Sequence, residues 1–176
     1  MIVGDLLRFA RDGRLGLGLL AIALLLALSC NGGGISPTGI SYPSVSSVEA
    51  ESFQLLNHAR LVQGNGLKPL VLDAELTKLA RQHSERMRDL NYFSHTDPVT
   101  GYFTDRLKAA HVVYIDAGEN IARVTGSSDP AGVAHDEFMT HPDHRANILS
   151  PLFTEVGVGA ARSGSTYWIT QLFIRP

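Results

Sequence analysis

The chain has 176 residues and a formal net charge of −2, with 15 lysines and arginines against 17 aspartates and glutamates. No run of basic residues occurs after the amino-terminal region, so nucleic acid is not an expected partner. Cys30 is the single cysteine, which excludes a fold held together by internal disulfides.

The amino-terminal residues have the pattern of an export signal. Three arginines precede an apolar stretch over residues 15–28, which at about 14 residues is shorter than the roughly 20 that span a membrane. Ser29 stands directly before Cys30, an arrangement that resembles the lipobox of bacterial lipoproteins. In those proteins the thiol is alkylated by diacylglycerol and the signal is removed. We therefore expect residues 1–29 to be a lipoprotein signal peptide and Cys30 to be the lipidated amino terminus.

Lipidation would attach the protein to a membrane without a spanning helix, at the cell surface or in the periplasm. The alternative is an uncleaved signal anchor with an incidental cysteine. Residues 30–47 are rich in glycine, serine and proline and are expected to form a flexible tether that begins at Cys30. Residues 48–176 then form a single domain, with enough length for a core of its own.

Two helices are predicted in the first part of this domain. Ser46-x-x-Glu49 has the spacing of a capping box, and apolar residues follow at helical intervals, which predicts a helix over residues 48–62. A Gly-Asn-Gly break leads into an extended link over residues 67–70. Asp73 can cap the second helix. Its apolar face is formed by Leu76, Leu79, Ala80, His83, Met87 and Leu90.

The middle of the domain predicts further short elements. Residues 92–101 are expected to form a loop, followed by a short helix over residues 104–110 and a β-rich stretch over residues 112–115. Ser128-Asp129-Pro130 supplies a cap and a proline at the first helical position, which predicts a helix over residues 130–140. Pro142 ends that helix.

The last part of the chain predicts a β-hairpin. Residues 156–160 and 166–173 have the composition of strands, and the segment between them contains Gly164. Helices combined with a few antiparallel strands predict an α+β domain in which helices cover a small, mainly antiparallel sheet.

Several short motifs occur in a fixed order between residues 50 and 174. They are Leu56-Asn57-x-x-Arg60, Leu67-x-Pro69-Leu70, Asp73-x-x-Leu76, Ala80-x-x-His83-Ser84, Phe93-Ser94-His95, Gly118-Glu119-Asn120-Ile121-Ala122, His144-Arg145-x-Asn147-Ile148-Leu149 and Val156-Gly157-Val158-Gly159. In order and spacing they resemble the CAP superfamily, which groups cysteine-rich secretory proteins, insect venom allergens, plant pathogenesis-related proteins and bacterial SCP-like domains.

The resemblance implies an α-β-α sandwich with a central cleft. In that cleft two histidines and two acidic residues face one another, and in some members they bind zinc or another divalent cation. His95, Glu119 and His144 match the first histidine, the first acid and the second histidine. The second acid is expected three residues after Phe138, where this chain has His141.

Two interpretations of these residues stay open at this point. His95, Glu119 and His144 can coordinate a divalent cation and leave a fourth position for water, and His141 can add a third nitrogen. Alternatively, the two matched histidines form a structural hydrogen-bonded pair in which Glu119 fixes a tautomer. The four remaining histidines, at positions 58, 83, 111 and 135, are expected on the surface or on helix faces without a special role.

The sequence favours a binding module over an enzyme. Ser94 precedes His95, but neighbours in an extended segment point to opposite sides, so the two do not form a catalytic dyad. The expected function is binding of a lipid or another cell-envelope ligand through the His/Glu cleft, with or without a divalent cation. The alternatives are a zinc-dependent hydrolase with Glu119 as general base, and a structural or partner-docking domain without a ligand.

The aromatic residues near the cleft allow two readings of their own. Those at positions 92, 93, 102, 103 and 114 are expected to pack in the core or rim, or to line an apolar groove for a sterol or fatty acid. Trp168 is expected in the core, and Arg145 and Asn147 are expected to brace the turn after His144.

Overall fold

The computed structural model describes residue 39 and residues 41–176 of the chain. The predicted signal peptide, Cys30 and most of the predicted tether lie outside these residues. The sheet has four strands in the order β1-β3-β4-β2. They are β1 (Val71–Leu72), β2 (Asp116–Thr125), β3 (Glu155–Ser163) and β4 (Thr166–Arg175). β1 lies parallel to β3, and the other two pairs are antiparallel.

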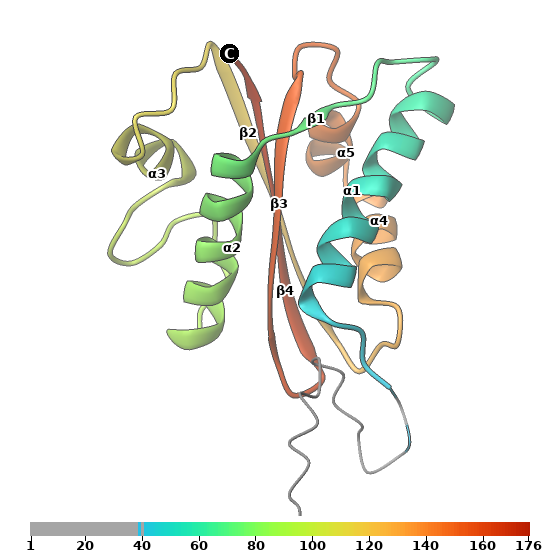
Figure 1. Cartoon of the computed structure of the whole chain (residues 1–176), viewed down its shortest axis with the longest axis vertical. Coiled ribbons are helices and arrows are strands. Elements are labelled where there is room, and N and C mark those ends of the chain that lie inside the picture. Colours follow the sequence, from blue (N-terminus) through green and yellow to red (C-terminus); the bar gives the residue numbers. More distant parts are fainter. Residues whose placement is uncertain (1–38, 40) are drawn as a thin grey trace, which may run out of the picture. The chain divides into compact units, whose positions relative to one another are not determined.

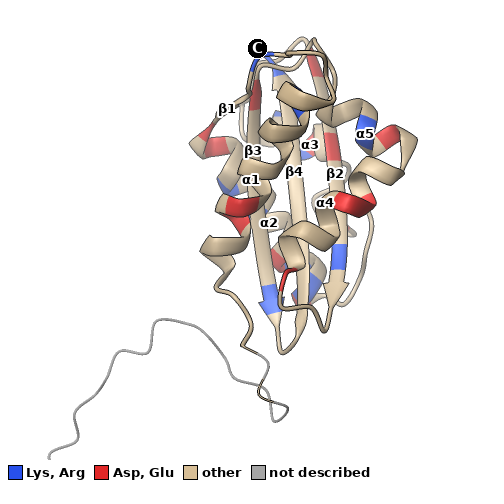
Figure 2. Ribbon diagram, turned by 90° about the vertical axis from the view of Figure 1, so that its right-hand side faces the viewer, with Lys and Arg blue, Asp and Glu red and all other residues tan. Residues whose placement is uncertain are grey.

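Helices cover both faces of the sheet. α2 (Ala74–Asp89) and α3 (Phe103–Ala109) lie on one face, and α1 (Val45–Val62), α4 (Pro130–Thr140) and α5 (Pro142–Ile148) lie on the other (Figure 1). Figure 2 looks onto the second face and shows α4 and α5 beside β2, which is one edge of the sheet. This arrangement is an α-β-α sandwich and confirms the predicted fold class.

Most predicted elements are present, and their caps explain where they begin. The side chain of Asp73 accepts a hydrogen bond of 2.8 Å from the backbone of Leu76 and starts α2 as predicted. Asp129 caps α4 through Gly132 in the same way. The predicted hairpin corresponds to β3 and β4. Pro142, predicted to end a helix, also starts α5, which the sequence analysis did not predict.

Two predicted boundaries are wrong. α1 begins at Val45 because Ser44, rather than Ser46, caps it by accepting from the backbone of Ser47 at 3.1 Å. The stretch 112–115 is not a strand. β2 begins at Asp116, opposite Arg175. Ile115 still donates to the carbonyl oxygen of Arg175 at 2.7 Å, but β4 ends there, so residues 112–114 have no strand opposite them.

The two glycines of the Val-Gly-Val-Gly motif allow α2 to lie directly on β3. A Cβ atom at Gly157 would overlap the backbone of Leu76 and Thr77, and one at Gly159 would overlap the backbone of Ala80 and Arg81. The helix therefore contacts the sheet without intervening side chains there. This close packing fixes the height of α2, which carries His83, above the sheet.

Arg60 ties α1 to the segment that follows α5. Its side chain is buried, and its guanidinium donates to the carbonyl oxygens of Ile148 and Ser150, both at 2.8 Å, and to Lys68 at 2.9 Å. Ile148 is the last residue of α5, whose terminal carbonyls have no partner within the helix, and Lys68 and Ser150 lie outside helices and strands, so these carbonyls need such donors. The end of α5 is thereby held against α1.

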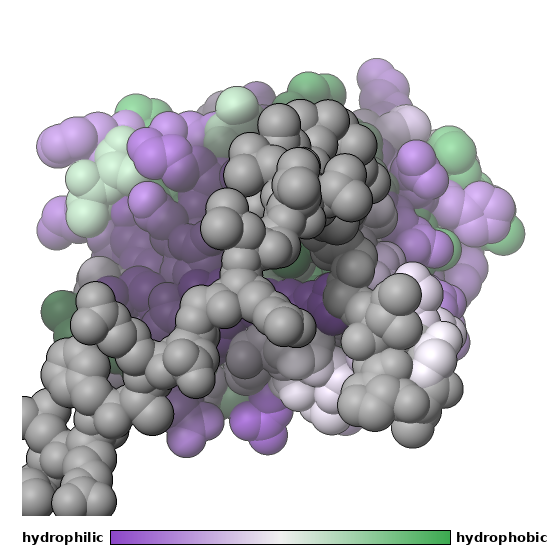
Figure 3. Space-filling view, turned by 60° about the horizontal axis from the view of Figure 1, so that its bottom comes forward, coloured by the Kyte–Doolittle hydropathy of each residue, from purple (hydrophilic) through white to green (hydrophobic). Residues whose placement is uncertain are grey.

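The visible end of the domain at the β3–β4 turn is largely hydrophilic, with apolar residues in small separate groups (Figure 3). None of the helices within residues 41–176 combines the length and the hydrophobicity that crossing a membrane requires.

Candidate functional site

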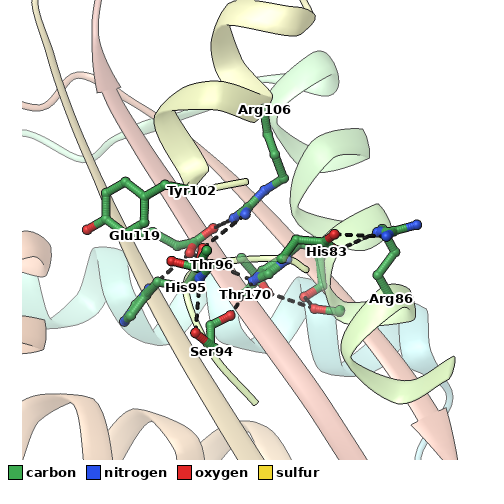
Figure 4. Close-up of polar contacts among 12 residues, drawn as sticks. His83, Arg86, Ser94, His95, Thr96, Tyr102, Arg106, Glu119 and Thr170 are labelled. Atoms are coloured by element: carbon green, nitrogen blue, oxygen red, sulfur yellow. Dashed lines mark hydrogen bonds and ion pairs between the residues drawn. The ribbon is translucent and has the colours of Figure 1, made fainter. Parts of the chain in front are cut away.

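Glu119 lies at the centre of the predicted site, on β2. Its side chain is buried. One carboxylate oxygen is 2.9 Å from Nδ1 of His95, and the other forms an ion pair with the guanidinium of Arg106 from α3 (Figure 4). Nε2 of His83, on α2, lies 3.9 Å from the first oxygen. The structure thus brings two predicted residues, His95 and Glu119, into direct contact.

The loop that carries His95 is held in place by Asp97. This buried carboxylate accepts hydrogen bonds from Arg86 at 2.8 Å, from the Tyr92 hydroxyl at 2.6 Å and from the backbone of Thr100 at 2.8 Å. Burial alone would raise the pKa of Asp97, but these donors hold the pKa well below its usual range. The charged form of Asp97 therefore anchors the loop to α2.

Arg106 also fixes the backbone of the His95 loop. One nitrogen of its guanidinium donates to the carbonyl oxygens of His95 at 3.0 Å and Gly101 at 3.1 Å, while the other nitrogen contacts Glu119. A single cation thus links α3, the loop and β2. The sequence analysis did not select Arg106; its place in a short helix after the Ser-His motif gave no sign of this contact.

His83 lies on the buried face of α2 and contacts the site, whereas the sequence analysis expected a surface or helix-face position without a special role. Its ring is fully buried, and Nε2 lies 3.1 Å from the carbonyl oxygen of Ser94. Burial lowers the pKa of His83 to about 4, although the nearby Glu119 opposes the shift. The burial of His83 could have been predicted, because this residue belongs to the apolar stripe of the second predicted helix.

The buried His83 makes the stability of the domain sensitive to acid. The pKa of His83 is about 4 in the folded state, whereas a histidine free of such surroundings has a pKa of 6.5, so between these values the unfolded chain binds more protons. The free energy of unfolding is therefore highest above pH 6.5 and decreases as the pH falls towards 4. We expect His83 to contribute roughly 2 kcal/mol to this decrease. Urea titrations at pH 7 and pH 4.5 measure it.

His83→Gln should remove this part of the pH dependence, because glutamine has no proton to gain. His58, which is exposed on α1, gives the matched control. His58→Gln should leave the dependence at its wild-type value. An unchanged difference between the two pH values in His83→Gln would contradict the assignment.

His144 lies on α5, across the open edge of β2. Its carbonyl oxygen accepts from the Asn120 side chain at 3.1 Å, and Asn120 accepts from Asn147 at 2.9 Å. A Cβ atom at Gly118 would lie 2.7 Å from the side-chain oxygen of Asn147, so the glycine allows this approach. Asn147 thus braces the turn after His144 as predicted, and it does so by bonding α5 to β2.

The imidazoles of His95 and His144 face each other without touching. Their ring centroids are 6.4 Å apart, and the rings of His141 and His144 are 5.6 Å apart. Nδ1 of His144 is buried and has no hydrogen-bond partner among the described residues. Burial, with smaller effects from the two neighbouring histidines, lowers the pKa of His144, so its ring is neutral at neutral pH.

The described residues do not fit the metal site that the resemblance implies. One oxygen of Glu119 is bonded to His95 and the other to the Arg106 cation, whose positive charge would repel a divalent ion placed beside it. Within residues 41–176, no three His, Cys, Asp or Glu side chains are placed to hold an ion. The position of the second acid holds His141, which is exposed.

The aromatic residues divide between core and rim. Phe103 and Trp168 are buried, as expected for core residues. Phe93 and Tyr102 are each 43% exposed, and the Tyr102 ring lies edge-on to His95 with centroids 6.5 Å apart. The cleft therefore has exposed aromatic rings beside its imidazoles.

Comparison with known proteins identifies the family. The sequence model described as "Cysteine-rich secretory protein family", CAP, matches residues 53–173. The chain belongs to the CAP family. The match begins within α1, ends within β4, and includes His95, Glu119 and His144.

Bacterial proteins are among its relatives. The uncharacterized protein YkwD of Bacillus subtilis is 44% identical over 131 residues, which cover 74% of this chain and 48% of YkwD. The uncharacterized membrane protein YlbC of the same organism is 33% identical over 143 residues, covering 80% and 39%. An extracellular SCP-domain protein of Bacillus anthracis has a TM-score of 0.64 and 34% identity, covering 82% and 45%. The chain spans less than half the length of each relative.

Proposed function

We propose that this CAP domain is a binding module for a cell-envelope ligand and that the cleft around His95, Glu119 and His144 receives it. The proposal rests on the contacts that the carboxylate of Glu119 makes. Both of its oxygens are engaged, by His95 and by Arg106, so the carboxylate is placed to hold the cleft together. The same contacts argue against the zinc-dependent hydrolase, which would need Glu119 free to take a proton from water.

The groups that face outward in the cleft are suited to binding. The side chain of His95 is 35% exposed, and the Tyr102 ring stands beside it. His144 supplies a neutral imidazole on the opposite side. Aromatic and imidazole rings offer apolar area together with hydrogen bonds, which is the usual composition of a ligand site.

We further propose that the protein is exported and attached to the membrane through lipid on Cys30, at the cell surface or in the periplasm. The names of two relatives support this location, since one is an extracellular protein and another a membrane protein. A domain on the outer side of a membrane would meet envelope components directly.

Cys30→Ser is expected to move the protein from the membrane fraction towards the soluble fraction, because serine cannot form the thioether. The measurement is fractionation of cells that express the full-length chain, together with incorporation of an alkyne-tagged fatty acid. Ser29→Ala is the matched control, since a small residue remains before the cysteine. A Cys30→Ser protein that fractionates like the wild type would favour the uncleaved signal anchor.

The cleft itself is tested with isolated bacterial envelope fragments as the probe. Full-length protein should sediment with the fragments, and the Tyr102→Ala/His144→Ala double variant should bind at least about fivefold more weakly, which corresponds to about 1 kcal/mol. Both side chains are partly exposed, so the fold should persist. Separate assays with lipid vesicles and with lipid-free cell wall identify which component is bound.

Val133→Ala serves as the control, because Val133 is an exposed residue on α4 that does not line the cleft. Equal binding by the wild type and the double variant would overturn the proposal and favour the structural or docking role. Repeating the assay with added zinc and with a chelator tests the dependence on a cation, and we expect no difference.

A further inference from the structure

β2 is an edge strand, and the backbone groups on its outer side form part of a hollow. The hydrogen bond from Gly126 to the carbonyl of Ser165 shows that the even-numbered residues of β2 pair with β4. The N–H and C=O groups of Ile121 and Arg123 therefore point away from β4. Glu119 agrees with this alternation, since its carbonyl accepts from the Asn147 side chain at 3.4 Å.

No described residue pairs with the outer backbone groups of Ile121 and Arg123. β2 has β4 as its one strand neighbour, and no other hydrogen bond within residues 41–176 reaches these groups. Open sheet edges are templates for another strand, and proteins usually block them. Here both residues line a hollow, in which Arg123 is exposed and Ile121 is buried.

This hollow has a volume of about 220 Å³ and contains residues from both helical layers. Phe93 comes from the loop after α2. Glu137 and Phe138 from α4, His141 between the helices and His144 from α5 lie on the opposite face. Ile121, Ala122 and Arg123 complete it. Side chains from opposite faces of a sheet meet only at its edge, so the hollow is a groove along β2.

Two opposite charges line this groove without neutralising each other. The guanidinium of Arg123 lies over the Phe93 ring, 5.4 Å from its centroid. Glu137 is exposed on α4. Among the described residues neither charge takes part in a salt bridge. Both charges are available to a ligand.

We infer that this groove binds an extended peptide segment, which adds to β2 as a further strand. Unpaired N–H and C=O groups at strand spacing match the backbone of a peptide. Side chains of a strand alternate between faces, so one residue of the ligand meets Arg123 and the next meets Glu137. The segment therefore carries an acidic residue next to a basic one. The inference rests on the proposed binding function and specifies the ligand as peptide.

The test uses random seven-residue peptides displayed on phage, selected on the full-length protein. The expected result is enrichment of sequences with adjacent acidic and basic residues. A synthetic peptide of the consensus should bind at least tenfold more weakly when its central amides are N-methylated. No enrichment, or binding that is indifferent to N-methylation, would overturn the inference.

Arg123→Pro removes the outward N–H and leaves the β4 ladder, because proline is tolerated at such positions of edge strands. Arg123→Pro should weaken peptide binding at least tenfold. Arg123→Ala, which keeps the N–H, should weaken it less. Thr125→Pro is the matched control, since Thr125 also faces outward but does not line the hollow. If Arg123→Pro and Thr125→Pro weakened peptide binding equally, the result would count against strand addition.

Amide hydrogen exchange tests strand addition on the wild-type protein alone. The peptide should slow exchange at Ile121 and Arg123 at least tenfold, while Ala122 and Val124 should be protected with and without it. Unchanged exchange at the two outward amides would overturn the inference. Envelope binding that is lost in Tyr102→Ala/His144→Ala but kept in Arg123→Pro would refute peptide binding and retain the proposed function. If both variants kept envelope binding, the proposed function itself would be refuted.

Discussion

Gly159→Ala is expected to lower the free energy of unfolding by about 3 kcal/mol or more. The added Cβ would overlap the backbone of Ala80 and Arg81, and backbone atoms cannot rotate away as a side-chain end can. Either α2 moves outward along its contact with β3, or the strand bends. Denaturation in urea, monitored by the fluorescence of the buried Trp168, measures the loss.

Gly126→Ala separates this overlap from the general effect of replacing a glycine. Gly126 has a φ of +77° and open space around its Cβ position, so alanine there meets only the strain of the left-handed conformation, about 1 kcal/mol. If Gly159→Ala were no more destabilising than Gly126→Ala, α2 would not be in the close contact with β3 that the structure has.

The position of α2 against β3 could be predicted in part from sequence. The stripe of apolar residues and the Asp73 cap are local features, and both are present in the structure as expected. The glycines of β3 were recognised as a family motif, but their role depends on a helix about 80 residues away in the chain. No local pattern reveals which backbone will approach a glycine.

The contrast between local patterns and contacts of distant segments also explains which site residues could be predicted. His95, Glu119 and His144 were found because short motifs mark them, and in the structure His95 bonds to Glu119 while the His144 ring lies 6.4 Å from the ring of His95. Arg106 was missed because its contact with Glu119 depends on how α3 packs. His83 was misjudged because a histidine on an apolar stripe is compatible with either a buried or a boundary position.

The sequence analysis also missed β2 as a strand, although it singled out the motif within it. Gly118 and Asn120 are poor strand formers, and Glu119 is charged, so propensity argues against a strand there. Pairing with β4 along ten residues overrides that preference. The unfavourable residues are present because each has a partner from another layer, as the contacts of Glu119 with Arg106 and of Asn120 with His144 illustrate.

Arg106→Met is expected to lower the free energy of unfolding by about 3 to 5 kcal/mol, because it leaves the carboxylate of Glu119 buried without a cation. The carbonyl oxygens of His95 and Gly101 lose their donor as well. Urea denaturation at pH 7 measures the effect. Lys78→Met is the control, since its ion pair with Glu75 lies on the surface and such pairs contribute about 1 kcal/mol or less.

Glu119→Gln in the Arg106→Met background decides whether the loss comes from the unpaired charge. Glutamine has the shape of glutamate without its charge, so the double variant should recover about 2 kcal/mol, whereas Glu119→Gln alone should destabilise the wild type. A double variant less stable than Arg106→Met would mean that the guanidinium acts mainly through the loop carbonyls. Recovery would establish that Arg106 acts mainly by pairing with the buried carboxylate of Glu119, and this is the contact that occupies an oxygen which a general base would need free.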